Sequence, residues 1–498
     1  MTKLDELKEL LQEMDHLSTA CVLLDWDLKT EAPKGAADVI VASLTALSTK
    51  AFELSVSEKM ETVVYALNEE DEYAKLDDVW KKAVRKMKDD FEENKRIPVD
   101  FYSQFVEDSA KAEHIWEEAK ATNNYALFAP YLAKNIANSI QMHKYMHPDM
   151  DPYASMLDTY EKGMDEATID RIFSELKEEL IPFVKEILSK PEPDDSKFKG
   201  VFDKHRQEEL SKFLLEYIGF DFEHGCIAES VHPFTTGTGR TNVRITNHYL
   251  KDDILSGIFS IIHEGGHGLF MQGPDECYNL TPYSDCAYMG LHESQSRIWE
   301  NIFGRNKNFW KPIYPKVQEL FPEFKDITLD EFYTEINHIR NGFIRCDSDE
   351  VTYCFHIILR YELEKELISG RLSVEDLPAA WNKKMEEYLG ITPPTDTLGV
   401  LQDTHWAGGA FGYFPSYLLG SIYDGMLLET MEAELGDIDT ILAEGRAKEL
   451  TKWLHDNIHR YGGFREPKEV LMAVCGKEAD AKPLMNYFRK KYTEIYGL

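Results

Sequence analysis

Two histidines four residues apart give this sequence its strongest indication of chemistry. His263 and His267 enclose Glu264, Gly265 and Gly266. Residues at positions i and i+4 of a helix lie on one face, so both imidazoles can reach one divalent ion. The glutamate after the first histidine is then placed to take a proton from a water that the ion activates. This HExxH pattern is typical of zinc peptidases, and we interpret Glu264 as the general base.

The residues around the two histidines support a metal site over a purely structural helix. An apolar run from Ile254 to Ile262 precedes them and predicts a buried helix over residues 252–271. Gly265 and Gly266 each cost such a helix about 1 kcal/mol relative to alanine. Glycine at these positions leaves room for a substrate or for another backbone to approach the metal closely.

A catalytic zinc needs a third protein ligand, because such sites use three protein ligands and a water. The metzincin pattern HExxHxxGxxH fails, since Phe270 and Gly273 stand where it requires glycine and histidine. Downstream, His292 and Glu293 are the candidates. Glu293 suits the role because it lies near the start of a helix predicted over residues 290–304. His292 stays open as the alternative ligand.

A glycine-rich segment from Gln402 to Tyr417 offers groups for the rest of the reaction. Peptide hydrolysis passes through a tetrahedral oxyanion, which needs hydrogen-bond donors besides the metal. His405, Tyr413 and Tyr417 are candidates for stabilising the oxyanion or orienting the substrate. For each of them taken singly, a structural role is the alternative.

An exopeptidase that acts at the C-terminus must also bind a free carboxylate, and arginine does this with two parallel hydrogen bonds. The candidates are Arg244 on a predicted strand, and Arg340 and Arg345 before the helix that begins at Glu350. The sequence does not rank these three residues, and a salt bridge is the alternative role for each.

Most of the chain carries apolar residues at the three- and four-residue spacing of amphipathic helices. We expect helices over residues 3–18, 37–70, 71–95, 98–122, 125–145, 168–189, 206–218, 252–271, 290–304, 329–338, 350–369, 375–388, 416–434, 438–458 and 467–495. Residues 226–249 differ, because small, β-branched and turn residues dominate there. They predict a small antiparallel sheet before the metal helix. Such an edge strand typically pairs with the backbone of a peptide substrate, and a structural hairpin is the alternative.

The composition indicates a folded globular protein and excludes several classes of partner. The chain has 498 residues, of which 43% are hydrophobic, and its net charge is −34. Nucleic acid and anionic membranes are disfavoured, since binding phosphates requires a basic surface. We interpret the charge as favouring solubility.

Cysteine usage and the apolar runs point to a reducing compartment. The seven cysteines are scattered, and no CxxC pair occurs. They indicate neither a disulfide framework nor a Cys-ligated zinc site. The N-terminal residues lack the core of a signal peptide, and no apolar run approaches transmembrane length. We therefore expect a cytoplasmic protein.

Several motifs, in order, resemble those of the carboxypeptidase Taq family of thermostable metallocarboxypeptidases, along essentially the full chain. The matching segments are HPF at His232–Phe234, HExxH at His263–His267, HES-Q at His292–Gln295 and GxxQDxHW at Gly399–Trp406. Leu24–Asp27 followed by Pro33 is also similar to the family's N-terminal region.

Two family motifs are altered in this chain. Asn242 replaces the aspartate of DxRxT at Asn242–Thr246, and Ser348 replaces the alanine of IRxxAD at Ile344–Asp349. Asparagine keeps a hydrogen-bonding oxygen and loses the charge. Neither change touches a presumed metal ligand, so we expect an effect on fine substrate preference at most.

The resemblance implies a mainly α, saddle-shaped fold with a deep central groove and a small antiparallel sheet beside the metal helix, similar to neurolysin and angiotensin-converting enzyme. Residues 1–498 would form a single domain, with helices of 1–195 as one wall of the groove and 196–498 carrying the metal site. The resemblance also implies a homodimer. The activity would be release of single amino acids, with broad specificity, from peptides with a free C-terminal carboxylate. One divalent metal is expected per chain, Zn²⁺ first, with Co²⁺ or Mn²⁺ as alternatives.

The family's site residues carry over to matching positions of this sequence. The resemblance assigns His263, His267 and Glu293 to the metal and Glu264 to the base. It places Arg345, together with Gln402 and Asp403, in the wall that recognises the C-terminal end of the substrate. His232 and Arg244, from the HPF and altered DxRxT motifs, would also bind substrate.

Two other readings compete with a single-residue carboxypeptidase. An oligopeptidase or dipeptidyl carboxypeptidase on a similar helical scaffold would share the metal triad and leave more room beyond the scissile bond. A non-catalytic peptide-binding protein is the other class. It is disfavoured because all four residues of the predicted centre are intact, namely His263, Glu264, His267 and Glu293.

Overall fold

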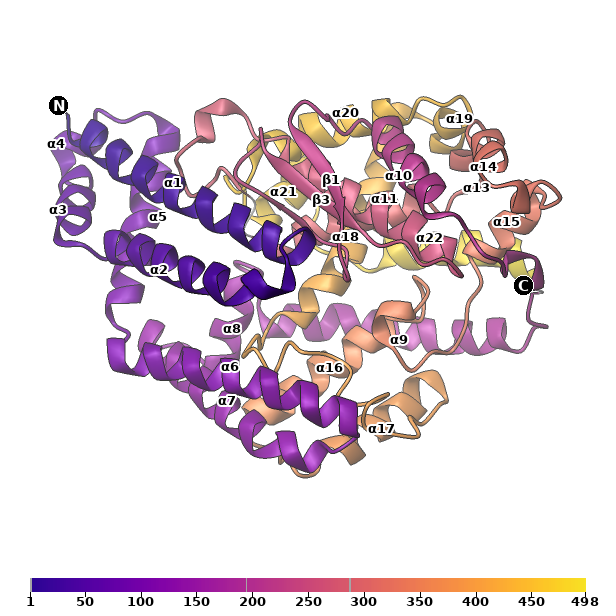
Figure 1. Cartoon of the computed structure of the whole chain (residues 1–498), viewed down its shortest axis with the longest axis horizontal. Helices are drawn as coiled ribbons and strands as arrows, with labels where there is room; N and C mark the ends of the chain where they lie inside the picture. Colours follow the sequence, from indigo (N-terminus) through magenta and orange to yellow (C-terminus); the bar gives the residue numbers. More distant parts are fainter. Residues whose placement is uncertain (1, 194, 286–287) are drawn as a thin grey trace.

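The computed structural model describes residues 2–193, 195–285 and 288–498 and is mainly helical (Figure 1). The helices are α1 Lys3–Thr30, α2 Ala37–Ser55, α3 Glu58–Leu67, α4 Glu70–Tyr73, α5 Asp78–Lys95, α6 Val99–Thr122, α7 Tyr125–Met146, α8 Pro152–Tyr160, α9 Glu166–Leu188, α10 Lys204–Ile218, α11 Ile254–Met271, α12 Met289–Arg297, α13 Lys307–Trp310, α14 Tyr314–Leu320, α15 Leu329–Ile336, α16 Tyr353–Ile368, α17 Leu377–Leu389, α18 Phe414–Leu435, α19 Ile438–Ala443, α20 Ala447–Asn457, α21 Pro467–Val474 and α22 Lys482–Tyr496. A π-helical segment, Ile298–Phe303, continues α12.

Several predicted helices are broken in two, and capping side chains explain two of the breaks. The helix expected over 37–70 ends at Ser55 and restarts as α3, where the Ser57 hydroxyl accepts from the Met60 amide at 3.2 Å. The helix expected over 71–95 restarts as α5 behind Asp77, whose carboxylate caps the Trp80 amide. The ranges 438–458 and 467–495 are also divided, and α8, α13 and α14 were not predicted.

The sheet has three strands: β1 Gly225–Glu229, β2 Thr235–Gly237 and β3 Val243–Asn247, in the order β1-β3-β2. The β2–β3 pair is antiparallel, as predicted, and the β1–β3 pair is parallel. The chain reverses direction twice, and β3 then inserts between the first two strands. It therefore runs alongside β1 in the same direction, so a purely antiparallel sheet is wrong for this pair.

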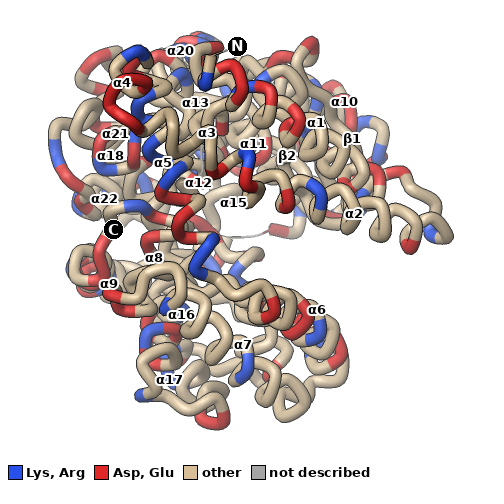
Figure 2. Tube along the Cα trace, turned by 90° about the vertical axis from the view of Figure 1, so that its left-hand side faces the viewer, with Lys and Arg blue, Asp and Glu red and all other residues tan. Residues whose placement is uncertain are grey.

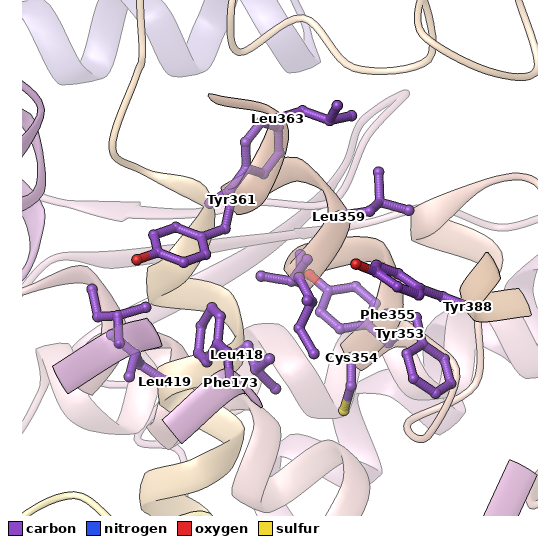
Figure 3. Close-up of a cluster of buried hydrophobic side chains, with 14 of the residues drawn as sticks. Phe173, Tyr353, Cys354, Phe355, Leu359, Tyr361, Leu363, Tyr388, Leu418 and Leu419 are labelled. Atoms are coloured by element: carbon purple, nitrogen blue, oxygen red, sulfur yellow. The ribbon is translucent and has the colours of Figure 1, made fainter. Parts of the chain in front are cut away.

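The hydrophobic core contains residues from helices that precede residue 195 in the sequence and from helices that follow it. One hydrophobic cluster packs α9 against α16 and α18, where the Phe173 and Tyr361 rings lie 5.3 Å apart beside Leu418 and Leu419 (Figure 3). A second cluster surrounds α11 and the sheet, and a third lies between α1, α3 and α5. Figure 2 shows α6, α7, α16 and α17 at one end of the molecule and α1, α2 and α11 toward the other. The single-domain organisation stays a prediction.

The structure can be compared with the expectations about membrane-spanning helices and about cysteines. Within the described ranges, no single helix has the length and apolar character to cross a membrane, although a bent pair, Lys34–Ser55 with Glu58–Leu67, meets both criteria at an angle of 43°. The thiols of Cys21, Cys226, Cys277, Cys346, Cys354 and Cys475 are free. Cys286 lies outside the described residues.

Glycines bring three helices of the site into backbone contact. A Cβ atom at Gly266 of α11 would lie 2.3 Å from the Gln295 carbonyl oxygen and 2.6 Å from the Ser296 Cα of α12. A Cβ at Gly420 of α18 would lie 2.9 Å from the Ser294 amide nitrogen on another side of α12. Atoms at such distances overlap, so only glycine permits this packing. Of the two roles expected for Gly266, close approach of another backbone is the observed one.

We expect Gly266→Ala to destabilise the protein and weaken metal binding together. The new methyl group has no space, so α12 must move away from α11 at a cost of about 1–3 kcal/mol. Denaturant unfolding and metal titration would measure the two effects. Gly35→Ala is the control, because a Cβ there meets nothing within 4 Å. Unchanged unfolding and metal affinity in Gly266→Ala would contradict the packing described above.

Candidate metal centre

Three donor atoms from two helices converge at one point. On α11, His263 Nε2 lies 3.7 Å and His267 Nε2 lies 3.5 Å from Glu293 Oε2 of α12. One donor atom from each residue falls within 4.8 Å of the others. Two imidazole nitrogens and a carboxylate oxygen at this spacing fit a divalent ion that keeps an open coordination position.

Glu293 is held in its ionised form by the basic side chains around it. The Arg297 guanidinium donates from Nε to Glu293 Oε1 at 2.9 Å, and the Ser296 hydroxyl lies 3.3 Å from Oε2. Burial favours the neutral acid, but His263, His267 and Arg297 together lower the pKa of Glu293 below its ordinary range. The carboxylate is therefore ready to bind a cation.

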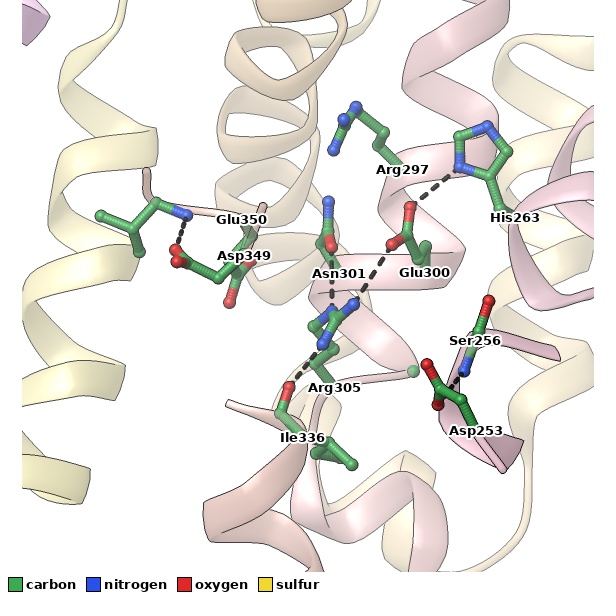
Figure 4. A network of polar contacts seen from close by, with 12 residues as sticks. Asp253, Ser256, His263, Arg297, Glu300, Asn301, Arg305, Ile336, Asp349 and Glu350 are labelled. Atoms are coloured by element: carbon green, nitrogen blue, oxygen red, sulfur yellow. Dashed lines mark hydrogen bonds and ion pairs between the residues drawn. The ribbon is translucent and has the colours of Figure 1, made fainter. Parts of the chain in front are cut away.

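Glu300 is a second carboxylate of the site, and the sequence analysis missed it. His263 Nδ1 lies 2.9 Å from Glu300 Oε2 (Figure 4), which leaves Nε2 for a metal. Burial opposes ionisation of Glu300, but the hydrogen bond to His263 and the charges of His263, Arg297 and Arg305 together lower its pKa to about 2. Arg305 approaches its other oxygen at 3.4 Å. A signal existed in the sequence, because Glu300 follows Glu293 by two helical turns and shares its face.

The electrostatics of the site favour a positive charge beside His263. Burial disfavours the protonated imidazole, yet Glu293 and Glu300 raise the pKa of His263 to about 9. With Glu264 next to it, this imidazole lies among three carboxylates. The same negative potential attracts a divalent cation in place of the proton.

His292 lies behind His267. Its Nδ1 is 2.6 Å from Nδ1 of His267, on the side of that ring away from Nε2, which faces Glu293. Burial, followed by the neighbouring His267, lowers the pKa of His292 to about 3, so the ring is neutral. The geometry therefore places His292 as an orienting partner of His267 and favours Glu293 over it as the third ligand.

The altered IRxxAD motif and the GxxQDxHW motif meet in one buried ion network. Asp403 accepts from Arg345 at 3.1 Å and 3.0 Å, and from Arg360 at 2.6 Å. Burial opposes the charge of Asp403, but Arg360 and Arg345 hold its pKa far below the ordinary range. Gln402 accepts from the Arg345 backbone amide at 2.9 Å.

Tyr353 connects this network to the metal donors. Its hydroxyl accepts from Arg345 at 3.0 Å, and its ring lies 3.8 Å from the guanidinium of Arg297, the residue that binds Glu293. Arg345 is thus linked to the metal cluster through a continuous series of contacts. Arg340, by contrast, is half exposed and bonds to Glu335 at 3.1 Å.

The aromatic residues of the glycine-rich segment gather beside Arg345. His405 Nε2 lies 3.1 Å from the Tyr417 hydroxyl, and the Arg345 guanidinium stacks 4.8 Å from the Tyr417 ring. Tyr413 packs edge-on against Tyr417 at 5.1 Å. Burial, and then the charge of Glu293, raise the pKa of Tyr413 to about 12. This phenol therefore stays protonated and can donate a hydrogen bond at neutral pH.

Arg244 and His232 occupy a different environment. Arg244 donates to Asn242 Oδ1 at 3.1 Å and lies 5.4 Å from the Trp26 ring. Trp26 also packs edge-on against Phe234 at 5.8 Å, so three family motifs form one cluster around α1 and the sheet. His232 is exposed on the loop before β2, and its carbonyl accepts from a serine hydroxyl. These contacts do not link either residue to the metal donors.

Two buried glutamates support the site without touching its donors. Glu161 accepts from the Gly290 amide at the start of α12 and from the Tyr423 hydroxyl at 3.3 Å. Glu364 accepts from Trp406 Nε1 at 2.7 Å and from the Gly412 amide at 2.6 Å. Burial raises the pKa of both to about 7. In the sequence, nothing distinguishes them from surface glutamates of amphipathic helices.

We expect Glu300→Gln to weaken metal binding about 10-fold to 100-fold, the range typical of lost outer partners of metal-bound histidines. The amide no longer supplies the charge that orients and polarises His263. Competition with a chelator of known affinity measures the change. Glu323→Gln removes one exposed charge elsewhere and is the control. Equal metal affinity in Glu300→Gln and Glu323→Gln would rule out this role for Glu300.

Comparisons with known proteins agree with the geometry. The model of a family described as "Carboxypeptidase Taq (M32) metallopeptidase" matches residues 6–492. The chain is 42% identical to Carboxypeptidase 1 of Bacillus subtilis over 99% of this chain and 98% of that one. It is 34% identical to Thermostable carboxypeptidase 1 of Thermus thermophilus, with the same coverage.

Solved structures share the fold. A crystal structure of an M32 carboxypeptidase from Deinococcus radiodurans superposes with a TM-score of 0.97 at 31% identity, covering all of both chains. A carboxypeptidase from Pyrococcus furiosus, in a structure titled "Apo-Mg", gives 0.94 at 32% identity over 99% of each chain. The mainly helical architecture implied by the motifs is thereby confirmed.

Proposed function

Because this chain belongs to the carboxypeptidase Taq (M32) metallopeptidase family and is a metal-dependent carboxypeptidase, we propose that it releases single amino acids from the free C-terminus of peptides with broad preference. The observation that carries the proposal is the cluster of His263, His267 and Glu293 next to Glu264. The contacts that run from this cluster to Arg345 support it further.

We assign His263, His267 and Glu293 as the ligands of one divalent ion. The donor set suits Zn²⁺, and Co²⁺ or Mn²⁺ are the alternatives. When bound, the ion would supply Lewis acidity, activating a water and polarising the scissile carbonyl. Glu300 and His292 orient the two imidazoles from behind, so that their Nε2 atoms face the same point.

The remaining steps fall to residues around this centre. Glu264 accepts the proton of the attacking water and passes it to the leaving amine. We propose Tyr413 as the donor to the developing oxyanion, because the charge of Glu293 acts on its phenol, whereas the Tyr417 hydroxyl is engaged with His405 at 3.1 Å. Tyr417 and His405 would hold Tyr413 and the substrate in place.

Arg345 is our candidate for binding the substrate's carboxylate. Its guanidinium has five N–H donors, and Asp403 and Tyr353 occupy only some of them. Asp403 fixes the plane of the group, as bidentate recognition requires. Gln402 fixes the backbone of Arg345.

Glu264→Gln and Glu293→Ala should separate catalysis from metal binding. We expect Glu264→Gln to retain stoichiometric metal and lose nearly all turnover, because the proton acceptor is gone while the ligands remain. Glu293→Ala should lose metal affinity. Elemental analysis after dialysis and peptide hydrolysis assays measure both properties. Substantial activity in Glu264→Gln would refute the mechanism, and full metal in Glu293→Ala would return His292 to consideration.

The peptide cleavage pattern tests the function itself. The metal-loaded protein is incubated with a mixed-sequence peptide and with the same peptide carrying a C-terminal amide, and the products are analysed by mass spectrometry. We expect a ladder of single-residue losses that amidation blocks, because the amide cannot pair with Arg345. Loss of dipeptides or internal cuts that ignore amidation would instead indicate a dipeptidyl carboxypeptidase or an oligopeptidase.

Two expectations from the sequence stay predictions. We propose a homodimer, which light scattering at two protein concentrations would test. We also propose a cytoplasmic location on the basis of the scattered cysteines, and cell fractionation would test it.

A further inference from the structure

Strand β2 contacts the proposed general base through one hydroxyl group. Thr235 Oγ1 lies 2.6 Å from Glu264 Oε2 and 3.0 Å from the backbone carbonyl oxygen of the same glutamate. The Glu264 side chain is buried, with 7% of the residue's surface exposed. Neither the HExxH pattern nor the HPF motif that ends at Phe234 includes this threonine.

The sheet fixes the position of this hydroxyl. Thr235 is opposite Ile245 in the β2–β3 register, and Ile245 is fully buried against α11. At the end of β2, a Cβ atom at Gly237 would lie 3.0 Å from the Met271 side chain, so the strand follows α11 closely. Side chains alternate along a strand, and Thr236 therefore points to the opposite face from Thr235. A group on a paired strand is held more precisely than one on a loop.

We propose that Thr235 is a positioning residue for the general base, which restricts the Glu264 carboxylate to one orientation. The inference rests on the proposed role of Glu264. Donation from the Thr235 hydroxyl to Oε2 leaves Oε1 as the oxygen that accepts the water's proton and returns it to the leaving amine. Oε2 keeps an acceptor lone pair when Oε1 is protonated, so the contact persists through both halves of proton transfer.

The backbone carbonyl at 3.0 Å gives the hydroxyl a second acceptor on the same residue. Both acceptors belong to Glu264, so Thr235 stays beside this residue whichever of them its proton faces. The branched Cβ of threonine also restricts its side chain to few rotamers. A glutamate without this partner has free side-chain torsions, and the fraction of time that its carboxylate faces the water falls.

The test replaces the hydroxyl without changing the shape of the side chain. We expect Thr235→Val to lower kcat on the order of 10-fold to 100-fold, the effect of losing one hydrogen bond to a charged group. KM should stay within about twofold, and bound metal should stay stoichiometric, because neither the ligands nor Arg345 change. Thr235→Ser should recover most of kcat. Thr236→Val makes the same chemical change on the opposite face of β2 and should behave as wild type.

A second pair of variants guards against misfolding of Thr235→Val. Thr235→Ser and Thr235→Ala differ by a single oxygen atom, and the inference requires the serine variant to turn over at least several-fold faster at equal thermal stability. Wild-type kcat in Thr235→Val, or equal kcat in the serine and alanine variants, would overturn the inference. So would a loss of kcat explained by loss of metal. Activity in Glu264→Gln would refute the proposed base itself, whereas an inactive Glu264→Gln with a fully active Thr235→Val would refute only the role of Thr235.

Discussion

The site depends on contact between two helix backbones. The metal donors come from α11 and α12, and the two helices meet where Gly266 faces the Gln295 carbonyl. At ordinary helix separations of 8–10 Å, side chains fill the space between axes. Here no side chain intervenes, and His267 approaches Glu293 to 3.5 Å as a result. Gly266 lowers the intrinsic stability of α11, but its lack of a side chain allows Glu293 to reach His263 and His267. The contact of Gly420 with the opposite side of α12 fixes that helix from behind.

A continuous series of charged and polar side chains extends from this contact through the buried part of the site. Glu293 is followed by Arg297, Tyr353, Arg345, Asp403 and Arg360, each touching the next. Arg360 is completely buried, and a charge in that position is tolerated only when it is paired. Removing one member leaves its neighbours uncompensated, so the network holds its geometry as a unit. This rigidity keeps the proposed carboxylate-binding arginine at a fixed position relative to the metal donors.

Much of the architecture was predictable because it follows from local patterns. Helical periodicity located most helices, and the i, i+4 spacing placed His263 and His267 on one face. The failures have physical reasons. Periodicity does not register a capping side chain, so Ser57 and Asp77 divided helices that were predicted as continuous. The parallel pairing of β1 depends on which strand enters the middle of the sheet, and strand propensities carry no information about it.

The supporting residues of the site were harder to predict than its donors. Glu161 binds the amide of Gly290, 129 residues away in the sequence. Glu364 binds the amide of Gly412, 48 residues away. Glu161 and Glu364 belong to none of the sequence motifs described above, and only the folded chain shows that they are buried. Motif resemblance grouped Arg345, Gln402 and Asp403 in one wall of the site, and the structure brings the three residues into contact. Their role in binding substrate stays a prediction.

The π-helical segment after α12 affects how chain length sets the geometry of the metal centre. In Ile298–Phe303 the Gly304 amide bonds to the Trp299 carbonyl, five residues back. A π turn contains one residue more than an α turn, so the segment is equivalent to a single-residue insertion. Losing that residue would rotate everything beyond it by about 100° relative to Glu293. Glu300, the partner of His263, lies inside this segment, whereas Glu293 lies before it on α12. A one-residue deletion within the segment would therefore move Glu300 relative to His263 and leave Glu293 in place, so the hydrogen-bond partner and the metal ligand respond separately to chain length.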